Sequence, residues 1–104
     1  MIKNKYKIQY LNSYKKELYE IIWYISHNLK NQKSAERLFN KVSNAIIKRS
    51  ICPKIYEMYK SKNDKKYVWY RIYVDNYTIF YTVKNDIMKV AHIIYSIRNI
   101  DDLI

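Results

Sequence analysis

Glycine is absent from this chain of 104 residues, and proline and cysteine occur once each. Without glycine there is no P-loop and no Gly-rich dinucleotide turn, because both need glycine where the backbone approaches a phosphate. The lone Cys52 excludes a disulfide within the chain and is typical of a reducing compartment. No run approaches the ~20 apolar residues of a membrane span, and residues 1–10 lack the apolar core of a secretory signal. We therefore expect a cytoplasmic protein.

Acidic residues are also scarce. The chain has 9 Asp and Glu against 20 Lys and Arg, which gives a formal net charge of +11. A field of this strength attracts polyanions and acidic proteins and speeds their capture. The charge alone does not choose between nucleic acid and an acidic peptide as the partner.

Histidine and cysteine are too few and too scattered for a metal site. His27, His92 and Cys52 show no H-x₃-H or C-x₂-C spacing, so we expect no metal and no cofactor. Cys52 falls at the end of a predicted helix before Pro53, where a small buried residue is the usual occupant. His92 falls between apolar residues of a predicted strand, which favours a hydrogen-bonded structural histidine over a general base.

The stretch 67–98 organises the predicted fold. Along residues 67–74, side chains alternate between two faces of a strand. One face receives Val68, Tyr70, Ile72 and Val74, and the other receives Trp69, Arg71 and Tyr73. Turn signals at Asp75-Asn76 and at residues 84–86 then introduce two further strands, over residues 77–83 and 87–95. These three strands predict an antiparallel meander.

The preceding residues predict a short strand and a helical hairpin. Residues 5–10 alternate as a strand that joins the sheet. A first helix, about residues 14–29, follows a cap at Asn12 or Ser13. A second helix is capped by Ser34 and stops at Cys52, because Pro53 cannot continue it. The apolar stripes are Leu18, Ile21, Ile22, Ile25 and Leu29 in the first helix, and Ala35, Leu38, Phe39, Val42 and Ile46 in the second. Their short connection predicts antiparallel packing.

The predicted fold is therefore α+β, with the helical hairpin on one face of a four-stranded, mainly antiparallel sheet. The length predicts a single domain over residues 1–104. Residues 54–66 show no clear period, concentrate lysine, and are predicted to form a mobile basic loop that leads into the sheet.

Arg71 is the most informative charge, because it stands among aromatic and aliphatic residues of a strand. Either it points to solvent beside Trp69 and Tyr73, or it helps to form an anion-binding face. With Arg98 and the lysines of residues 54–66, it would define a basic, tyrosine-rich surface suited to phosphate contact and base stacking. Ordinary solvated cross-strand residues explain the same pattern equally well.

The order of these elements resembles the RelE/ParE superfamily, the toxins of type II toxin–antitoxin modules. The resemblance covers nearly the whole chain; its individual motifs are loose, but their order and spacing are fairly specific. The residues that carry it are KYKIQYLNSYKKELYEIIWYI, AERLFNKVSNAIIKRSICP, YRIYVDNYTIFYTV and IIYSIRNIDDLI. The resemblance implies a toxin that inhibits bacterial growth, with a role in plasmid stabilisation.

Two activities are known in this superfamily. RelE-like members are ribosome-dependent mRNA endonucleases that need no metal, because basic side chains stabilise the developing charge and a base activates the 2′-hydroxyl. ParE-like members are not nucleases and poison DNA gyrase. By position, an arginine of the nucleases falls on Thr78, and a histidine base of one nuclease branch falls on Ser96. Other basic positions of the nucleases are matched by Arg71 and Arg98.

The missing arginine and the long, Pro-terminated hairpin favour the ParE-like activity. The alternative is a RelE-like nuclease, in which Arg71 and Arg98 would stabilise phosphate charge, Tyr95 would orient the RNA, and a lysine of the basic loop would compensate for Thr78. A third hypothesis is an inactive toxin fold that binds RNA or protein. Target or antitoxin contacts are expected at Lys62, Lys65, Lys66, Arg71, Tyr95, Arg98, Leu103 and Ile104. Partners would be DNA gyrase, or ribosome and mRNA, together with an acidic or amphipathic antitoxin that wraps the basic toxin.

Overall fold

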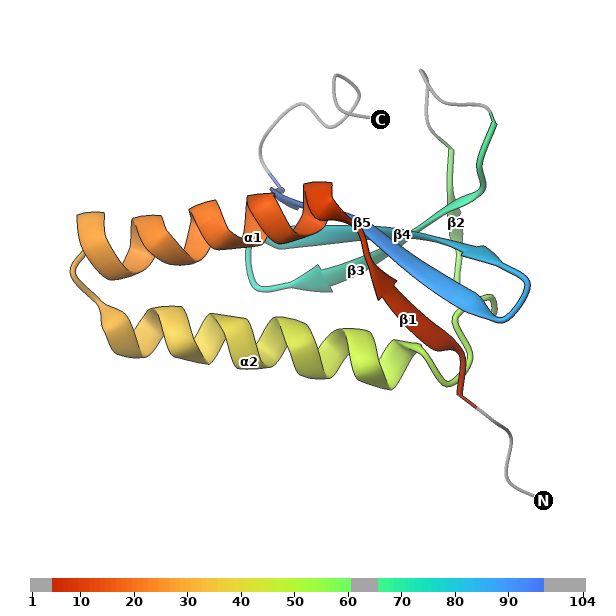
Figure 1. Cartoon of the computed structure of the whole chain (residues 1–104), viewed down its shortest axis with the longest axis horizontal. Coiled ribbons are helices and arrows are strands. Elements are labelled where there is room, and N and C mark those ends of the chain that lie inside the picture. The colour runs from red at the N-terminus through yellow and green to blue at the C-terminus, as the bar shows by residue number, and fades with distance from the viewer. Residues whose placement is uncertain (1–4, 61–65, 97–104) are drawn as a thin grey trace.

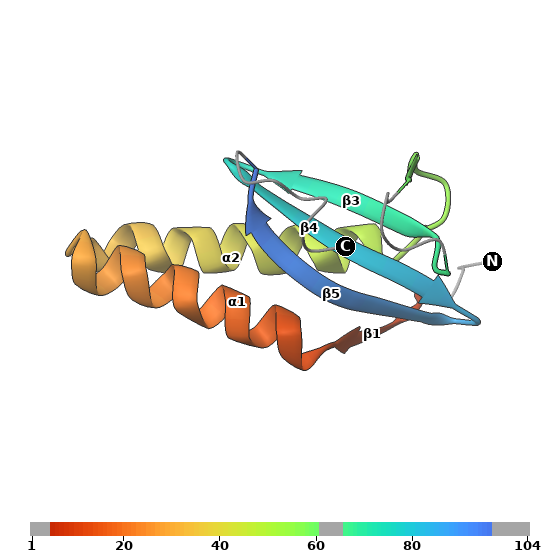
Figure 2. The same ribbon diagram turned by 90° about the horizontal axis from the view of Figure 1, so that it is seen from above.

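The computed structural model describes residues 5–60 and 66–96, which form two helices on one face of a five-stranded sheet (Figure 1). The strand order is β1-β5-β4-β3-β2, and the view in Figure 2 shows β1, β5, β4 and β3 side by side. The strands are β1 (Lys7–Tyr10), β2 (Met58–Tyr59), β3 (Trp69–Val74), β4 (Tyr77–Lys84) and β5 (Ile87–Tyr95). β1 runs parallel to β5, and every other neighbouring pair is antiparallel. The predicted α+β class and meander are confirmed.

The predicted four-stranded sheet omitted β2, which lies within the stretch expected to be a basic loop. Met58 pairs with Tyr70, and Tyr59 pairs with Trp69. Two residues are too short to show an alternating pattern, so no sequence signal announces this strand. Its pairing with β3 covers part of an edge that would otherwise expose unpaired backbone groups.

The helices begin at different residues from those predicted. α1 (Asn12–Trp23) continues into a π-helical turn, η1 (Tyr24–Asn28), and its N-cap Leu11 makes no side-chain cap. The expected cap residue Ser13 instead donates from Oγ to the carbonyl oxygen of Ala91 at 2.6 Å. Before α2 (Gln32–Arg49), Asn31 is the cap rather than Ser34, since its Oδ1 accepts from the Ser34 N–H at 3.0 Å. Within the described ranges, no helix is long and apolar enough to cross a membrane.

α2 ends at Arg49, with Ser50 as its C-cap, three residues before the predicted end at Cys52. Cys52 lies in the turn that follows and is exposed, so the prediction of a buried Cys52 was wrong. Because the helix ends three residues earlier, Cys52 is off the apolar stripe of α2, and Pro53 is buried in this turn instead.

The main core lies between the helices and the sheet. Its buried side chains are Tyr14, Leu18, Leu38, Val42, Ile46, Tyr70, Ile72, Val74, Ile79, Tyr81, Met88, Val90 and Ile93. Figures 1 and 2 show that the turn of the hairpin projects beyond the sheet. Leu29 at that end is therefore 57% exposed, although it belongs to a predicted apolar stripe. Phe39 of the other predicted stripe is 47% exposed, because it lines an open groove between α1 and α2.

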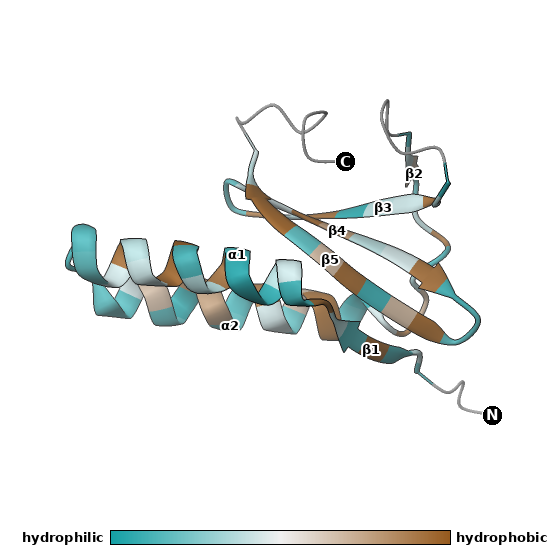
Figure 3. Ribbon diagram, turned by 45° about the horizontal axis from the view of Figure 1, so that its top comes forward, coloured by the Kyte–Doolittle hydropathy of each residue, from teal (hydrophilic) through white to brown (hydrophobic). Residues whose placement is uncertain are grey.

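A second buried cluster lies on the face of the sheet away from the helices, called the far face below. It consists of Trp69, Phe80, Ala91 and Ile94, with Leu11 and Tyr59 packed against it. Figure 3 shows how hydrophobic residues along β5 are interrupted by single hydrophilic ones, as expected for a strand that is buried on both faces.

Two turns and one bulge set the register of the meander. Asp75 and Asn85 have φ values of 53° and 57°, a left-handed conformation that these residue types tolerate without glycine. In β4 and β5, Phe80 pairs with His92 whereas Tyr81 pairs with Val90, which leaves Ala91 as the extra residue of a β-bulge. The ladder is disrupted at this point, and the carbonyl oxygen of Ala91 accepts from Ser13.

Candidate functional site

Arg71 extends from the centre of β3 on the far face and is half-buried. Its guanidinium carbon lies 4.7 Å from the ring centroid of Tyr59 and 5.4 Å from that of Tyr73. Tyr59 comes from β2, so the short strand missing from the prediction supplies one of the two rings. Stacking uses the flat faces of the guanidinium and leaves its N–H donors for other acceptors. Arg71 is thus a positioned cation rather than a side chain free in solvent.

Aromatic rings form a layer around Arg71. Phe80 lies directly opposite Arg71 in the sheet register and packs edge-on against Tyr59 and Trp69, with ring centroids 5.3 and 6.5 Å apart. Tyr73 is 63% exposed, so its ring is available to a partner. Arginine and tyrosine are the residue types that most often dominate binding energy at protein interfaces.

Arg49 supports Arg71 from the helix side of the sheet. Its Nη1 donates to the carbonyl oxygen of Arg71 and to the hydroxyl of Tyr81, both at 2.9 Å. Its guanidinium carbon also lies 3.5 Å from the ring centroid of Tyr56. The Tyr81 hydroxyl donates in turn to the carbonyl oxygen of Pro53 at 2.7 Å. This network fixes the segment that leads from α2 to β2.

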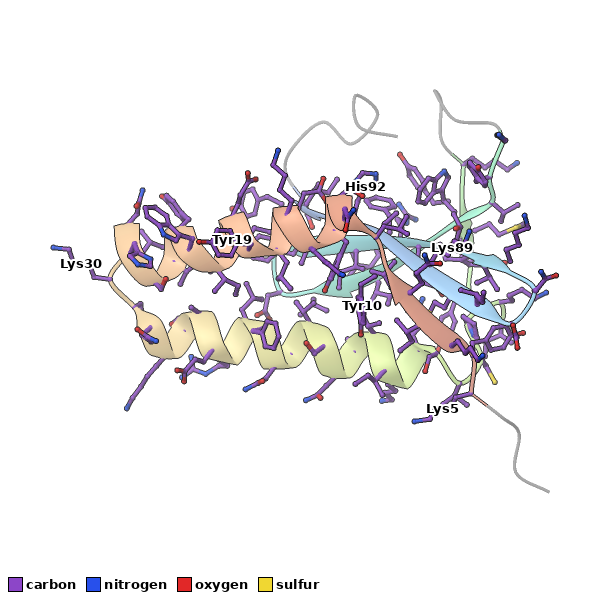
Figure 4. All side chains as sticks on the ribbon, viewed as in Figure 1. Lys5, Tyr10, Tyr19, Lys30, Lys89 and His92 are labelled. Carbon is purple, nitrogen blue, oxygen red and sulfur yellow. The ribbon has the colours of Figure 1, made fainter. Side chains whose placement is uncertain are left out.

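Glu17 of α1 contacts His92 and Ile93 of β5. Both residues lie beyond Val90, the last residue of β5 that pairs with β1. One carboxylate oxygen accepts from the N–H of Ile93 at 3.0 Å, and the other lies 3.0 Å from Nδ1 of His92. Figure 4 shows His92 on β5 beside the first turns of α1. The prediction of a hydrogen-bonded structural histidine is confirmed. Since an ionised carboxylate only accepts, Nδ1 of His92 is the donor in this pair.

A groove of about 560 Å³ lies beside Glu17, between α1, η1 and the ends of β4 and β5. Its described lining includes Glu17, Glu20, Tyr24, Tyr77 and Tyr95. The rings of Tyr77 and Tyr95 meet edge to face with centroids 5.6 Å apart. Burial raises the pKa of Tyr77, and the neighbouring Tyr95, Asp75 and Tyr24 raise it further. Three tyrosines therefore line this groove, one from η1 and two from the sheet.

Arg71 and Tyr95, both predicted site residues, do not converge. Tyr95 pairs with Tyr77, and Arg71 pairs with Phe80, three residues further along β4. Side chains three residues apart on one strand point to opposite faces, and Tyr77 packs against the core on the helix side. Tyr95 thus lies with the groove, whereas Arg71 lies on the far face.

Of the other predicted site residues, Lys66 lies within the described ranges. Lys66 is exposed, and its Nζ lies 5.4 Å from the ring centroid of Tyr67. The remaining predicted residues, Lys62, Lys65, Arg98, Leu103 and Ile104, lie outside the described residues.

Thr78 and Ser96 are neighbours in space. The nuclease resemblance would place an arginine at the first position and a histidine base at the second. Thr78 is buried, at 1% exposure, and its Oγ1 lies 2.8 Å from Oγ of Ser96. Ser96 also donates from its N–H to the carbonyl oxygen of Asn76 at 2.8 Å. Both side chains are neutral hydroxyls that satisfy each other, so this pair provides no cation for a phosphate.

Sequence reasoning missed Arg49, Glu17 and Tyr59. Arg49 follows Val42 and Ile46 of the apolar stripe by seven and three residues, so its helical phase could have identified it as a core-facing cation. Glu17 and Tyr59 carry no comparable signal, because their partners lie on strands far away in the sequence.

The comparisons with known proteins agree with this fold. The model of the ParE toxin of type II toxin–antitoxin systems, parDE, matches residues 8–100. Among solved structures, a chain of the archaeal RelE–RelB complex from Pyrococcus horikoshii OT3 matches with a TM-score of 0.53 and 14% identity. The match covers 92% of this chain and 100% of that chain, and at this identity it shows the fold alone. No curated protein matches the chain significantly.

The family match spans nearly all of the elements described above, from β1 through β5. The resemblance to the RelE/ParE superfamily is thereby confirmed. This chain belongs to the ParE toxin family, the toxins of type II toxin–antitoxin systems.

Proposed function

We propose that this protein inhibits bacterial growth by poisoning DNA gyrase and that it does not cleave mRNA. The observation that carries the proposal is the pair Thr78 and Ser96. Thr78 is buried and its hydroxyl is hydrogen-bonded to Ser96, where the nuclease branch would need an arginine and a base. A neutral buried hydroxyl cannot stabilise the charge that develops on a phosphate during strand cleavage.

The positions of the other candidate residues support the same proposal. Arg71 and Tyr95 lie on opposite faces of the sheet, so they do not form one catalytic constellation. General acid–base chemistry needs groups within hydrogen-bond reach of the same reacting atoms. His92, the described histidine of the sheet, is bound to the carboxylate of Glu17.

The surface of Arg71, Tyr59 and Tyr73 is the proposed contact for the target. Its cation is held between two rings, and Tyr73 is 63% exposed. A preorganised arginine beside an exposed aromatic ring loses little conformational entropy when it binds a partner. The predicted contacts at Lys62, Lys65, Lys66 and Arg98 would extend this surface.

An antitoxin is the proposed regulatory partner. The matched archaeal structure is a complex of RelE with RelB, and the ParE family is defined by a toxin–antitoxin system. A net charge of +11 favours an acidic or amphipathic antitoxin segment that covers the basic surface and thereby neutralises the toxin. We further propose that residues 1–104 act as one domain in the cytoplasm.

Pulse-labelling of DNA and protein synthesis after induction of this chain alone tests the proposal. We expect DNA synthesis to fall first, and we expect the purified chain to inhibit supercoiling by gyrase. If protein synthesis falls first and mRNA is cleaved on ribosomes, the chain is a nuclease and the proposal fails. If neither synthesis falls, the chain is a binding module without toxicity.

Arg71→Ala is the variant to compare with the wild type in the pulse-labelling and gyrase supercoiling assays. Arg49 is bonded to the main-chain carbonyl of Arg71 and not to its side chain, so this substitution leaves the support of β3 in place. Lys84→Ala is the control, because it removes an exposed cation from the last residue of β4, four positions along that strand from Phe80, the partner of Arg71. Loss of toxicity in Arg71→Ala alone identifies the target surface.

A further inference from the structure

The groove beside Glu17 differs in charge from the rest of the molecule. The chain carries a formal charge of +11, yet both charged residues among the described lining are glutamates, Glu17 and Glu20. The remaining lining combines the tyrosines 24, 77 and 95 with isoleucine side chains. A groove with carboxylates and aromatic rings inside a basic protein attracts a cation and not the polyanion that the whole surface attracts.

Helical spacing brings one wall of the groove together. Glu17, Glu20 and Tyr24 follow one another at intervals of three and four residues, which places them on the same face of α1 and η1. Glu17 is held in place by the N–H of Ile93 and by His92. Glu20 is exposed, and no side chain or N–H among the described residues forms a hydrogen bond or ion pair with its carboxylate.

The sheet supplies the other wall. Tyr95, at 39% exposure, packs edge-on against the partly buried Tyr77, and the position of both rings is set by their pairing between β4 and β5. The face of a tyrosine ring attracts a cation that lies within about 6 Å, and arginine is the cation found most often in this arrangement. From the helix side, the partly buried Ile21 adds apolar surface that would cover the aliphatic part of such a side chain.

We propose that this groove binds an arginine side chain from a partner polypeptide. The proposal rests on the proposed function only in that it assumes a polypeptide partner. The flat guanidinium suits a site in which the tyrosine rings of the sheet face the carboxylates of α1, because it stacks and donates at the same time. A divalent metal ion fits less well, since no group of three His, Cys, Asp or Glu side chains in the described residues is arranged to hold one.

An arginine-binding groove would give the protein a second determinant of partner recognition. An acidic segment would bind the far face, whereas one arginine of the same partner would enter the groove. A partner without that arginine would still be attracted by the net charge but would leave Glu20 and the tyrosines uncovered. Charge at long range and the groove at short range would therefore select different features of the partner.

A titration of the ¹⁵N-labelled chain with Nα-acetyl-arginine amide, followed by NMR, tests the groove directly. We expect saturable shifts of the amides of Glu20, Tyr24, Ile93 and Tyr95, with a Kd in the range of about 1–10 mM that is typical of one anchoring side chain. Nα-acetyl-citrulline amide has nearly the same shape without the charge, and we expect it to produce no saturable shifts. Equal responses to both compounds would overturn the proposal.

Glu20→Gln and Tyr95→Ala should each weaken the binding of the arginine compound about three- to fivefold, the effect of one exposed ion pair or cation–π contact. Glu36→Gln is the matched control, because it removes the same charge from α2 outside the groove. If Glu36→Gln weakens binding as much as Glu20→Gln, the attraction is nonspecific and the proposal fails.

One further variant tests whether the arginine that enters the groove comes from a partner or from this chain. Arg98 follows the groove residue Tyr95 closely in the sequence, so the titration is repeated with Arg98→Gln. If the arginine compound binds to the Arg98→Gln variant but not to the wild type, the chain's own arginine competes for the groove. That result would overturn the assignment of the groove to a partner. Because the titration does not involve growth or gyrase, its failure leaves the proposed toxicity intact, and loss of toxicity leaves the titration valid.

Discussion

Arg49 donates a hydrogen bond to the main-chain carbonyl oxygen of Arg71, with 2.9 Å between Nη1 and the oxygen. The bond connects the last turn of α2 to the middle of β3, through the core side of the sheet. The side chain of Arg71 projects from the opposite face, towards Tyr59 and Tyr73. The strand that carries the proposed target contact is thus fixed by a cation on its other side.

Arg49→Met should lower the free energy of unfolding by about 2–3 kcal/mol. The substitution preserves much of the volume but leaves the Arg71 carbonyl and the Tyr81 hydroxyl without their charged donor, and part-buried groups that lose a partner are costly. Urea unfolding measures the change. Lys48→Met, an exposed neighbour on the same helix turn, should change stability by less than about 0.5 kcal/mol. Equal effects of the two substitutions would show that the network contributes no stability.

Glu17→Ala should destabilise the protein more than Glu17→Gln. Alanine removes the acceptors for both the Ile93 N–H and His92, at a cost of about 1–2 kcal/mol, whereas glutamine keeps one carbonyl oxygen that can accept from the Ile93 N–H. Hydrogen exchange of the Ile93 amide provides the residue-specific measurement, and it should accelerate strongly only in Glu17→Ala. If exchange of the Ile93 amide is unchanged in Glu17→Ala, Glu17 does not protect the backbone of β5 by its hydrogen bond.

Alkaline conditions should destabilise the protein through its buried tyrosines. Burial raises the pKa of Tyr14, and burial also raises that of Tyr81, although Arg49 opposes the shift there. A folded-state pKa above the unfolded value of about 10 gives a stability contribution that is complete below pH 10. That contribution is lost as the pH rises through the folded-state pKa. Denaturant unfolding between pH 9 and about pH 11.5 should therefore show declining stability.

Tyr14→Phe is the informative variant for this pH dependence, because it removes one of the buried phenols. The decline of stability with pH should become shallower in Tyr14→Phe than in the wild type. Tyr19→Phe, at a position that is 67% exposed, serves as the control and should leave the slope unchanged. A slope that is the same in all three proteins would assign the alkaline transition to other groups.

Tyr73→Ala should reduce toxicity without loss of folding. Tyr73 is 63% exposed and stacks on Arg71, so its removal frees the guanidinium and removes contact area at little cost to the core. Growth after induction measures the effect, and gyrase inhibition by the purified variant should weaken about tenfold, equivalent to about 1.4 kcal/mol of binding energy. Tyr67→Ala, another exposed tyrosine, is the comparison variant. If only Tyr67→Ala loses toxicity, the contact surface lies elsewhere.

The helices, the meander and both turns could be predicted because each depends on local patterns. Apolar spacing in α1 and α2 and alternation in β3 are visible within one element. The caps were predicted less well, since Ser13 uses its hydroxyl for Ala91 on a distant strand and Asn31, one residue before α2, provides the actual cap. Leu29 satisfies the helical period but extends beyond the sheet, so the pattern alone could not indicate its exposure.

The candidate site was only partly accessible from the sequence. Arg71 stood out because a cation in an apolar strand is unusual. Its partner Tyr59 belongs to a strand of two residues, which has no period to detect. The separation of Arg71 from Tyr95 follows from the pairing of β3, β4 and β5, and register is a property of the assembled sheet rather than of one strand.

The parallel pairing of β1 with β5 has a consequence for synthesis of the toxin. Of the described strands, β1 is made first, and its neighbour in the sheet, β5, is made last. The sheet cannot close until β5 has also emerged, and contacts between such distant segments form slowly. Any activity that depends on the closed sheet would thus arise only late in translation, after β5 has been made.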